Sequence, residues 1–114
     1  MVNVFDTSGI LNNFGPIELE GYITNSVISE IRDFEFKTKL NNAISVGILK
    51  IEDPTKESIE KVKKIQLESH LKLSNTDIEV IALAFEKKAI LFSDDYNILH
   101  ACRILKMETK KIIR

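Results

Sequence analysis

The sequence has one cysteine, two histidines, two prolines and no tryptophan among its 114 residues. Cys102 cannot form a disulfide within the chain, and there are too few cysteines and histidines for a zinc site of the usual kind. No apolar run approaches the roughly 20 residues needed to cross a bilayer, and the amino-terminal stretch lacks both regions of a signal peptide. We therefore expect one soluble domain over 1–114, located in the cytoplasm, with Cys102 as a buried structural thiol.

Charge of neither sign is in large excess, because the formal net charge is only −1. This balance argues against a histone-like, strongly basic nucleic-acid binder. The charges are nevertheless unevenly distributed: residues 1–35 hold six acids and one base, whereas residues 87–114 hold seven bases and three acids. A basic surface over the last third of the chain would suit a polyanionic substrate, although lysines on solvated helix faces explain the same pattern.

Short apolar runs alternate with helical periodicity along the whole chain. Strands are expected at 2–6, 48–51 and 89–92, with a brief strand or loop at 18–24 and a last edge strand at 110–114. Helices are expected from residue 7 to the break at Gly15-Pro16, from Thr24, over 33–46 with Gly47 as the stop, from Pro54, over 78–85 behind a capping box at 74–77, and over 98–105. Strands separated by helices predict an α/β domain with a parallel sheet and right-handed crossovers.

Two of the expected strands end in acids. The run at 2–5 leads into Asp6, and the run at 90–92 leads through Ser93 into Asp94 and Asp95. Ligands of open α/β sheets gather outside the carboxyl ends of the strands, so these acids predict one shared acidic site. Glu30 and Asp77, near two helix starts, are candidates for the same site, and carboxylates without a histidine or cysteine cluster favour Mg²⁺ or Mn²⁺.

Each acid also has a simpler interpretation. Asp77 suits the first turn of a helix, Glu30 suits a solvated helix face, and either Asp94 or Asp95 suits a helix cap. Asp6 is the hardest to explain in this way, because an acid at the end of an apolar strand has no evident local role.

Four segments resemble the acidic motifs of PIN-domain ribonucleases, in the family's order and spacing. They are Phe5-Asp6-Thr7-Ser8, Val27–Ile31, Leu73–Asp77 and Phe92–Tyr96. The resemblance covers nearly the whole chain. It implies a three-layer α/β/α fold with a central, mostly parallel sheet, and a Mg²⁺- or Mn²⁺-dependent endoribonuclease that leaves 5′-phosphate and 3′-hydroxyl ends.

The same resemblance implies roles for single residues. The ligands and catalytic residues would be Asp6, Glu30, Asp77, Asp94 and Asp95, with the order of Asp94 and Asp95 as ligands left open. Thr7 and Ser93 would support them by hydrogen bonds.

Two subgroups of the family are candidates. The residues at 30–33, 73–78 and 94–96 are most similar to the motifs of the archaeal and eukaryotic endonuclease that trims the 3′ end of small-subunit ribosomal RNA. That endonuclease normally carries a zinc ribbon after its PIN domain. With one cysteine in a chain that ends at Arg114, we expect that ribbon to be absent or a separate partner. The length favours VapC-type toxins, which are usually dimeric and are neutralised by an antitoxin. A non-catalytic PIN-like RNA-binding module is the third alternative.

Basic residues near the carboxyl terminus are candidate contacts to RNA phosphates. They are Arg103, Lys106, Lys110, Lys111 and Arg114. If these decorate a solvated edge strand or a dimer contact instead, the RNA path would run along Lys37, Lys39 and the lysines of 61–64.

Overall fold

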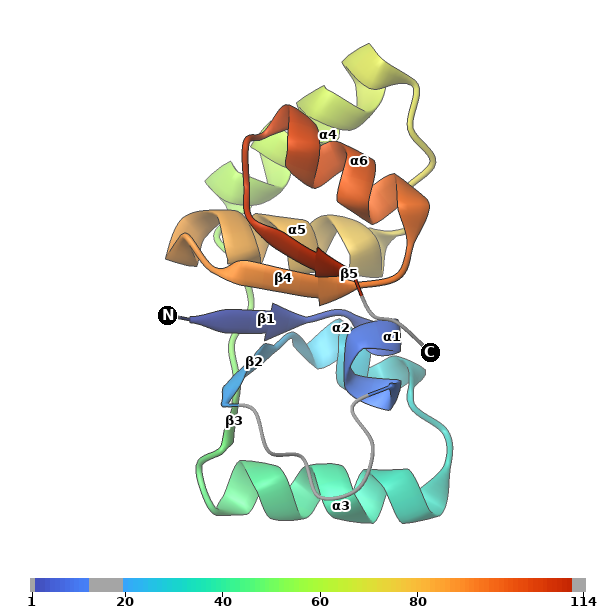
Figure 1. The fold of residues 1–114 in the computed structure, drawn as a ribbon, viewed down its shortest axis with the longest axis vertical. Coiled ribbons are helices and arrows are strands. Elements are labelled where there is room, and N and C mark those ends of the chain that lie inside the picture. Colours follow the sequence, from blue (N-terminus) through green and yellow to red (C-terminus); the bar gives the residue numbers. More distant parts are fainter. Residues whose placement is uncertain (1, 13–19, 112–114) are drawn as a thin grey trace.

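The central element is a five-stranded, all-parallel sheet with the strand order β3-β2-β1-β4-β5. The computed structural model describes residues 2–12 and 20–111. The strands are β1 (Asn3–Phe5), β2 (Gly21–Ile23), β3 (Leu49–Ile51), β4 (Ile90–Ser93) and β5 (Thr109–Lys111). Figure 1 shows the sheet with its strands pointing toward one edge of the molecule, where the short helices α1 and α2 lie.

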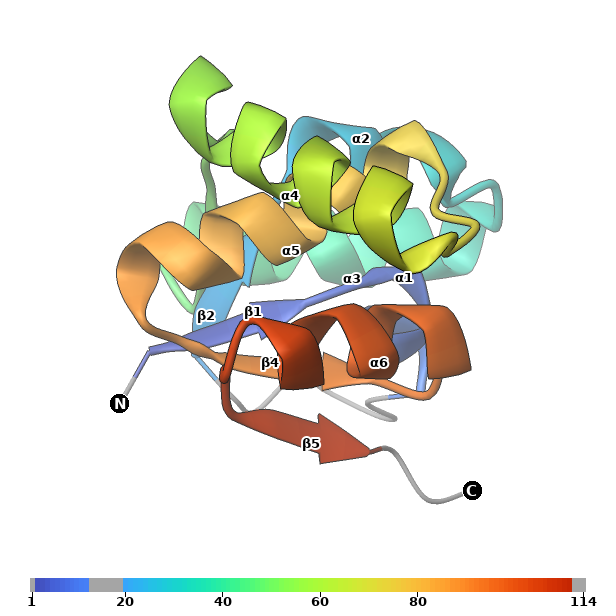
Figure 2. The ribbon, with the colours of Figure 1, turned by 90° about the horizontal axis from the view of Figure 1, so that it is seen from above.

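Helices flank this sheet, so the predicted three-layer α/β/α fold is confirmed. They are α1 (Thr7–Leu11), α2 (Asn25–Glu30), α3 (Phe34–Ser45), α4 (Lys56–Ser69), α5 (Asn75–Lys87) and α6 (Tyr96–Ile104). Helix α5 packs on β1 and β4 and contacts both α4 and α6, and α3 contacts β3. Figure 2 shows α4 stacked over α5, with α6 below them, in front of β4 and above β5.

Helix α5 is central because its sequence is apolar on nearly every side. Its residues Ile78 and Val80–Ala84 are all buried. Such a helix must be covered by other elements, and α4, α6 and the sheet cover it here. Its first turn is fixed by the predicted capping box, in which Ser74 and Asp77 each accept the other's backbone N–H. The carboxylate of Asp77 is thereby positioned at the start of the most deeply buried helix.

The pairing of β1 with β4 sets the position of the acids. Asn3 is paired with Ile90 and Phe5 with Phe92, so both strands end at the same level. Val4, Phe5 and Leu91 are fully buried or nearly so, which ties both strands to the core. Asp6, just after β1, and Ser93, the last residue of β4, therefore lie side by side.

Two details of the helix predictions were wrong. Pro54 was placed in the first turn of α4, but Thr55 is the N-cap and accepts the Ser58 N–H, so Pro54 precedes the cap. The helical pattern over 33–46 predicts an apolar set of Phe34, Leu40, Ala43 and Ile44, but Phe34 is the first residue of α3 and is 81% exposed. A periodic pattern does not show where the cap falls, and the first turn of α3 extends beyond the core that Leu40 and Ala43 reach.

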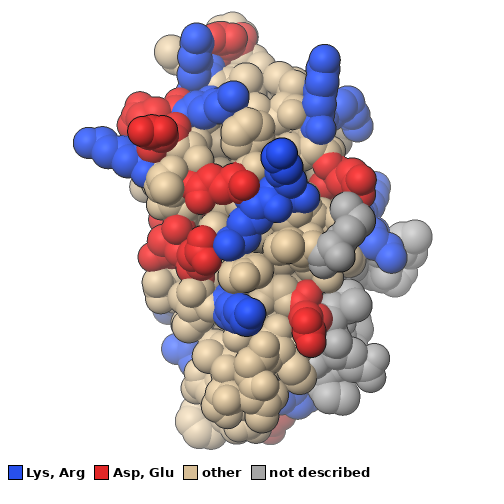
Figure 3. All heavy atoms as spheres, turned by 90° about the vertical axis from the view of Figure 1, so that its left-hand side faces the viewer, with Lys and Arg blue, Asp and Glu red and all other residues tan. Residues whose placement is uncertain are grey.

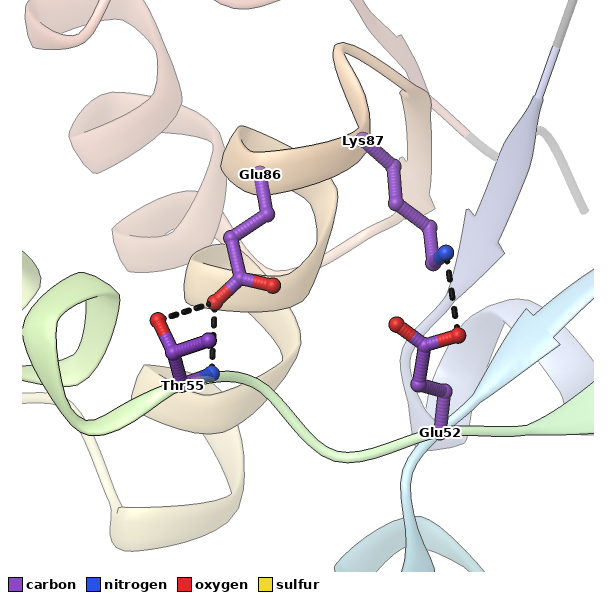
Figure 4. Close-up of polar contacts among 4 residues, drawn as sticks. All are labelled: Glu52, Thr55, Glu86 and Lys87. Carbon is purple, nitrogen blue, oxygen red and sulfur yellow. Dashed lines mark hydrogen bonds and ion pairs between the residues drawn. The ribbon is translucent and has the colours of Figure 1, made fainter.

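The segment between β3 and α4 is held to the end of α5 by polar contacts between two pairs of residues (Figure 4). The backbone N–H and the hydroxyl of Thr55 both donate to Glu86 Oε1, at 2.5 and 2.6 Å. Lys87 Nζ lies 3.0 Å from Glu52 Oε1. The first contacts join the start of α4 to the end of α5, and the ion pair joins the end of β3 to the end of α5.

Some expectations lie outside the described residues. The helix break at Gly15-Pro16 and the last part of the strand predicted over 110–114 are among them, whereas Lys110 and Lys111 do belong to β5. No helix within the described ranges is long and apolar enough to cross a membrane. Cys102 is fully buried, as predicted.

Candidate active site

All five predicted acids line one pocket at the carboxyl edge of the sheet. The pocket has a volume of about 410 Å³, and its lining consists of Asp6, Thr7, Ser8, Leu11, Asn12, Glu30, Asp77, Asp94 and Asp95. The acids come from four separate parts of the chain: the end of β1, the end of α2, the first turn of α5 and the β4–α6 connection. The fold thus gathers carboxylates that lie as far apart as residues 6 and 95.

Asp6 lies deepest and is only 5% exposed. Its Oδ1 accepts the Gly9 N–H at 2.5 Å and the Ser8 hydroxyl at 2.8 Å, while Oδ2 accepts the Ser93 hydroxyl at 2.5 Å. Asp6 is therefore the N-cap of α1, a local role that the sequence analysis did not recognise. The same contacts hold its carboxylate in one orientation between β1 and β4.

Gly9 allows α1 to lie directly against the end of β4. A Cβ added to Gly9 would overlap the carbonyl oxygen of Phe92 and would come within 3.0 Å of Asp6 Oδ1. That carbonyl cannot easily move, because it accepts the backbone N–H of Asp6. A glycine three residues after a strand-end acid is the only sequence signal of this contact.

Ser8 is a second residue that the sequence analysis missed. Its hydroxyl donates to Asp6 and accepts the backbone N–H of Asp94 at 3.3 Å. Ser8 thus links the two strand ends from the helix side, as Ser93 does from the sheet side. The sequence signal for Ser8 is its position directly after Thr7, which was already a candidate. Asn12 also lines the pocket, but no feature of the sequence pointed to it.

Glu30 and Asp77 enter the pocket with one oxygen already engaged. Thr7 donates its hydroxyl to Glu30 Oε1 at 2.5 Å, which joins α1 to α2. Asp77 Oδ2 accepts the Ser74 N–H at 3.0 Å. Thr7 therefore contacts one of the acids, and Asp77 caps a helix while it lines the pocket.

The β4–α6 connection gives Asp94 and Asp95 different environments. Asp95 is the N-cap of α6, with Oδ1 accepting the N–H groups of Asn97 and Ile98 at 2.8 and 3.2 Å. Ser93 Oγ accepts the Asp95 N–H at 3.0 Å while donating to Asp6. Asp94 lies between Ser93 and Asp95 in the sequence and lines the same pocket.

The clustering of carboxylates perturbs their ionisation. Burial raises the pKa of Asp6 above its ordinary value; hydrogen bonds from Ser93, Gly9 and Ser8 oppose this, and the charge of Asp94 adds to it. Burial likewise raises the pKa of Asp77, and the charges of Asp95 and Glu30 add to the rise. Burial, with the nearby charge of Asp6, also raises the pKa of the Cys102 thiol to about 12, so this thiol stays protonated.

The donor set of the pocket fits a hard divalent cation. Five carboxylates line it with hydroxyl and amide groups, and no histidine or cysteine is present in its lining. Burial raises the pKa values of Asp6 and Asp77, and a cation would offset the repulsion from neighbouring acids that adds to this rise. Among the described residues no group of three His, Cys, Asp or Glu side chains forms a ready-made metal site. The carboxylates are thus assembled around one pocket with several oxygens committed to helix caps.

The basic candidates lie in two different places. Lys111 is paired with Ser93 in the β4–β5 ladder, so it stands at the level of the acids, and Lys110 Nζ lies 5.9 Å from the ring centroid of Phe92. Arg103 and Lys106 lie at the other end of α6, which begins at the acids and rises about 1.5 Å per residue away from them. Lys106 lines a cavity of about 530 Å³ there with Glu86, Lys88 and Glu108.

Figure 3 faces the edge of the molecule at which the strands begin. Lysine and arginine side chains are interspersed there with acids, and no field of a single sign is formed. Arg114 lies outside the described residues. The lysines of β5 are therefore better placed toward the acidic pocket than Arg103 and Lys106 are.

The fold is a parallel α/β/α sheet with an acid-lined pocket at the carboxyl edge of its strands. The family described as the PIN domain of ribonuclease matches residues 3–86. The chain therefore belongs to the PIN-domain ribonuclease family.

Three individual proteins are similar in sequence to most of this chain. The chain is 40% identical to endoribonuclease Nob1 of Pyrococcus abyssi over 100 residues, which are 86% of this chain and 62% of the relative. It is 38% identical to endoribonuclease Nob1 of Methanocaldococcus jannaschii over 113 residues, 97% of this chain and 56% of the relative. Ribonuclease VapC1 of Thermoplasma acidophilum is 31% identical over 112 residues, 94% of this chain and 56% of the relative. The chain thus spans little more than half the length of these relatives.

Proposed function

We propose that this protein is a Mg²⁺- or Mn²⁺-dependent endoribonuclease that hydrolyses phosphodiester bonds in single-stranded RNA. The observation that supports the proposal most is the gathering of five carboxylates from four parts of the chain around one pocket of about 410 Å³. Repelling carboxylates are costly to bring together without a cation, so a purely structural role explains them poorly. Membership of a ribonuclease family supplies the substrate class.

The proposed ligands are Asp6, Glu30, Asp77, Asp94 and Asp95. A bound divalent cation would supply activation of a water and neutralisation of charge at the scissile phosphate. Asp6 is held for this role by Ser8, Gly9 and Ser93, so its charge is fixed at the base of the pocket. Thr7 orients Glu30, and the helix caps orient Asp77 and Asp95.

We assign the protein to the maturation of ribosomal RNA, which would be its substrate, and we place it in the cytoplasm. Relatives named endoribonuclease Nob1 support this assignment, and the motif wording at 73–78 and 94–96 agrees with it. The relative named VapC1 supports a second candidate, a toxin ribonuclease that forms a homodimer and is held inactive by an antitoxin.

Replacing Asp6 by asparagine tests the catalytic proposal. The amide still accepts the Gly9 N–H, so the fold is preserved, while the charge is lost. We expect the Asp6→Asn protein to melt no lower than the wild type and to lose cleavage of short ribosomal RNA fragments in Mn²⁺. The matched control is Glu57→Gln, which removes an exposed acid of α4 outside the pocket.

The outcome separates the alternatives. EDTA should abolish wild-type cleavage, and Glu57→Gln should cleave at the wild-type rate. Wild-type cleavage by a folded Asp6→Asn protein would overturn the assignment of the pocket. RNA binding without cleavage in either metal would leave the non-catalytic RNA-binding module as the function.

A further inference from the structure

Two aromatic side chains remain in solvent while the other described aromatics pack against the protein. Phe34 is 81% exposed and Tyr96 is 70% exposed. Phe5 is buried, and the remaining described aromatics, Tyr22, Phe36, Phe85 and Phe92, are half-buried. A single exposed ring is common on protein surfaces, so the position of these two rings relative to the acidic pocket carries the argument.

Both exposed rings are attached to the acidic pocket by short, ordered segments. Tyr96 directly follows Asp95, and Phe34 follows Glu30 by four residues, which limits the separation of those two Cα atoms to about 14 Å. Each is the first residue of its helix. Figure 1 shows that α3 and α6 both begin at the edge toward which the strands point, with α1 and α2 between them.

The ring of Tyr96 is oriented as well as exposed. Its centroid lies 5.9 Å from that of His100, with an edge-on interplanar angle of 86°. The cap of α6 beneath it is fixed by two hydrogen bonds to Asp95 Oδ1. A ring that is held on one side and open on the other loses little conformational entropy when a second planar group stacks on it.

The chemistry of the pocket favours such contacts. Five carboxylates repel the phosphates of an approaching RNA, so the strand needs attractive contacts that do not depend on its charge. Unpaired bases supply them, because every base has a flat face that stacks on an aromatic side chain regardless of its sequence.

We infer that Tyr96 and Phe34 are stacking platforms for unpaired RNA bases on either side of the scissile phosphate. This inference rests on the proposed function and names how its substrate is held. The two rings make no ring–ring contact with each other and belong to different helices, so they do not form one apolar face of the kind that docks a protein. A duplex, whose bases are already stacked and paired, cannot use either platform.

Intrinsic fluorescence tests the role of Tyr96 directly, because the chain has two tyrosines and no tryptophan. In a Tyr22→Phe protein Tyr96 is the sole tyrosine, and the substituted ring still packs beneath Lys87. Titration with a single-stranded RNA ten-mer in EDTA, where no cleavage occurs, should quench its emission. An abasic ten-mer of equal charge should quench it much less, and the Tyr96→Phe protein, whose emission comes from Tyr22 alone, should show no quenching.

Affinities measured in the same buffer test both rings. Tyr96→Ala and Phe34→Ala should each weaken binding of the ten-mer roughly 5- to 150-fold, whereas Tyr96→Phe should keep wild-type affinity because the ring remains. The control is Val46→Ala, which removes an equally exposed side chain (70%) just beyond the other end of α3.

The results also separate this inference from the proposed function. Unchanged Tyr96 emission at saturating RNA, or wild-type affinity of either alanine variant, would overturn the stacking assignment even if the protein cleaves RNA. Quenching and weakened alanine variants, in a protein that cleaves nothing in Mn²⁺, would uphold stacking and overturn the proposed function.

Discussion

Gly9→Ala is the substitution whose effect the structure defines most sharply. The added methyl group would overlap the Phe92 carbonyl oxygen and crowd Asp6 Oδ1. Both atoms are fixed, the carbonyl by the Asp6 N–H and the carboxylate by Ser8 and Ser93. Helix α1 must therefore shift away from β4, and the hydrogen bond from the Gly9 N–H to Asp6 must lengthen.

Overpacking of a closely packed contact costs about 1–3 kcal/mol of unfolding free energy. For a domain of this size, about 1 kcal/mol corresponds to roughly 4 °C in the melting temperature. We therefore expect Gly9→Ala to melt roughly 4–12 °C below the wild type. Differential scanning calorimetry measures both quantities.

Gly21→Ala provides a matched control. A Cβ at Gly21 would lie 2.5 Å from Phe5 Cε2 and 2.7 Å from the Asn3 carbonyl oxygen, a similar clash remote from the acids. Both variants should lose stability, but only Gly9→Ala should lose cleavage and Mn²⁺ binding at a temperature where both are folded. A Gly9→Ala protein within about 0.5 kcal/mol of the wild type would refute the close contact between α1 and β4.

Three further predictions concern the pocket and its surroundings. The pKa values of Asp6 and Asp77 are raised in the folded state, so the metal-free protein should lose stability as pH rises from the ordinary value of 3.8 through the raised values. Calorimetry should show a smaller loss of stability over the same pH range in saturating Mg²⁺. A melting temperature of the metal-free protein that rises over that pH range would contradict this prediction. Thr55→Ala, which removes the α4 cap and one donor to Glu86, should cost about 1 kcal/mol in chemical denaturation and leave cleavage unchanged in a gel assay. Replacing Lys110 and Lys111 by glutamine should reduce the salt slope of RNA binding by about 1.4, or about 0.7 for each phosphate that is no longer neutralised, while an unchanged slope would direct the search to Lys37, Lys39 and the lysines of 61–64.

Much of the architecture could be predicted because it rests on local patterns. Apolar runs of strand length, the capping box at Ser74 and the all-round apolar character of 78–85 led to the correct elements in the correct order. The strand-end acids could be foreseen as neighbours since β1 and β4 are both parallel and buried. Periodicity did not predict that Phe34 would leave the core, because burial at a helix start depends on where the partner elements end.

The fine structure of the pocket was less accessible to the sequence. Ser8 and Gly9 act through contacts with residues more than 80 positions away, and such contacts leave no local pattern. Counting charges also did not distinguish Lys111, at the level of the acids, from Lys106, at the far end of α6. The number of charges in a segment does not show at which end of the sheet each charge lies.

Three of the five pocket acids also serve as capping residues, and this double role determines how they should be studied. Asp6 and Asp95 are N-caps, and Asp77 completes a capping box. Alanine removes both the cap and the charge, so a loss of activity in an alanine variant mixes a local change of fold with a loss of metal affinity. Asparagine caps a helix about as well as aspartate, so at Asp77 and Asp95 it removes the charge and keeps the cap. At Asp6 its NH2 group also replaces the oxygen that accepts the Ser93 hydroxyl. The stability of the asparagine variant relative to the alanine variant therefore measures the cap, and its activity relative to the wild type measures the charge.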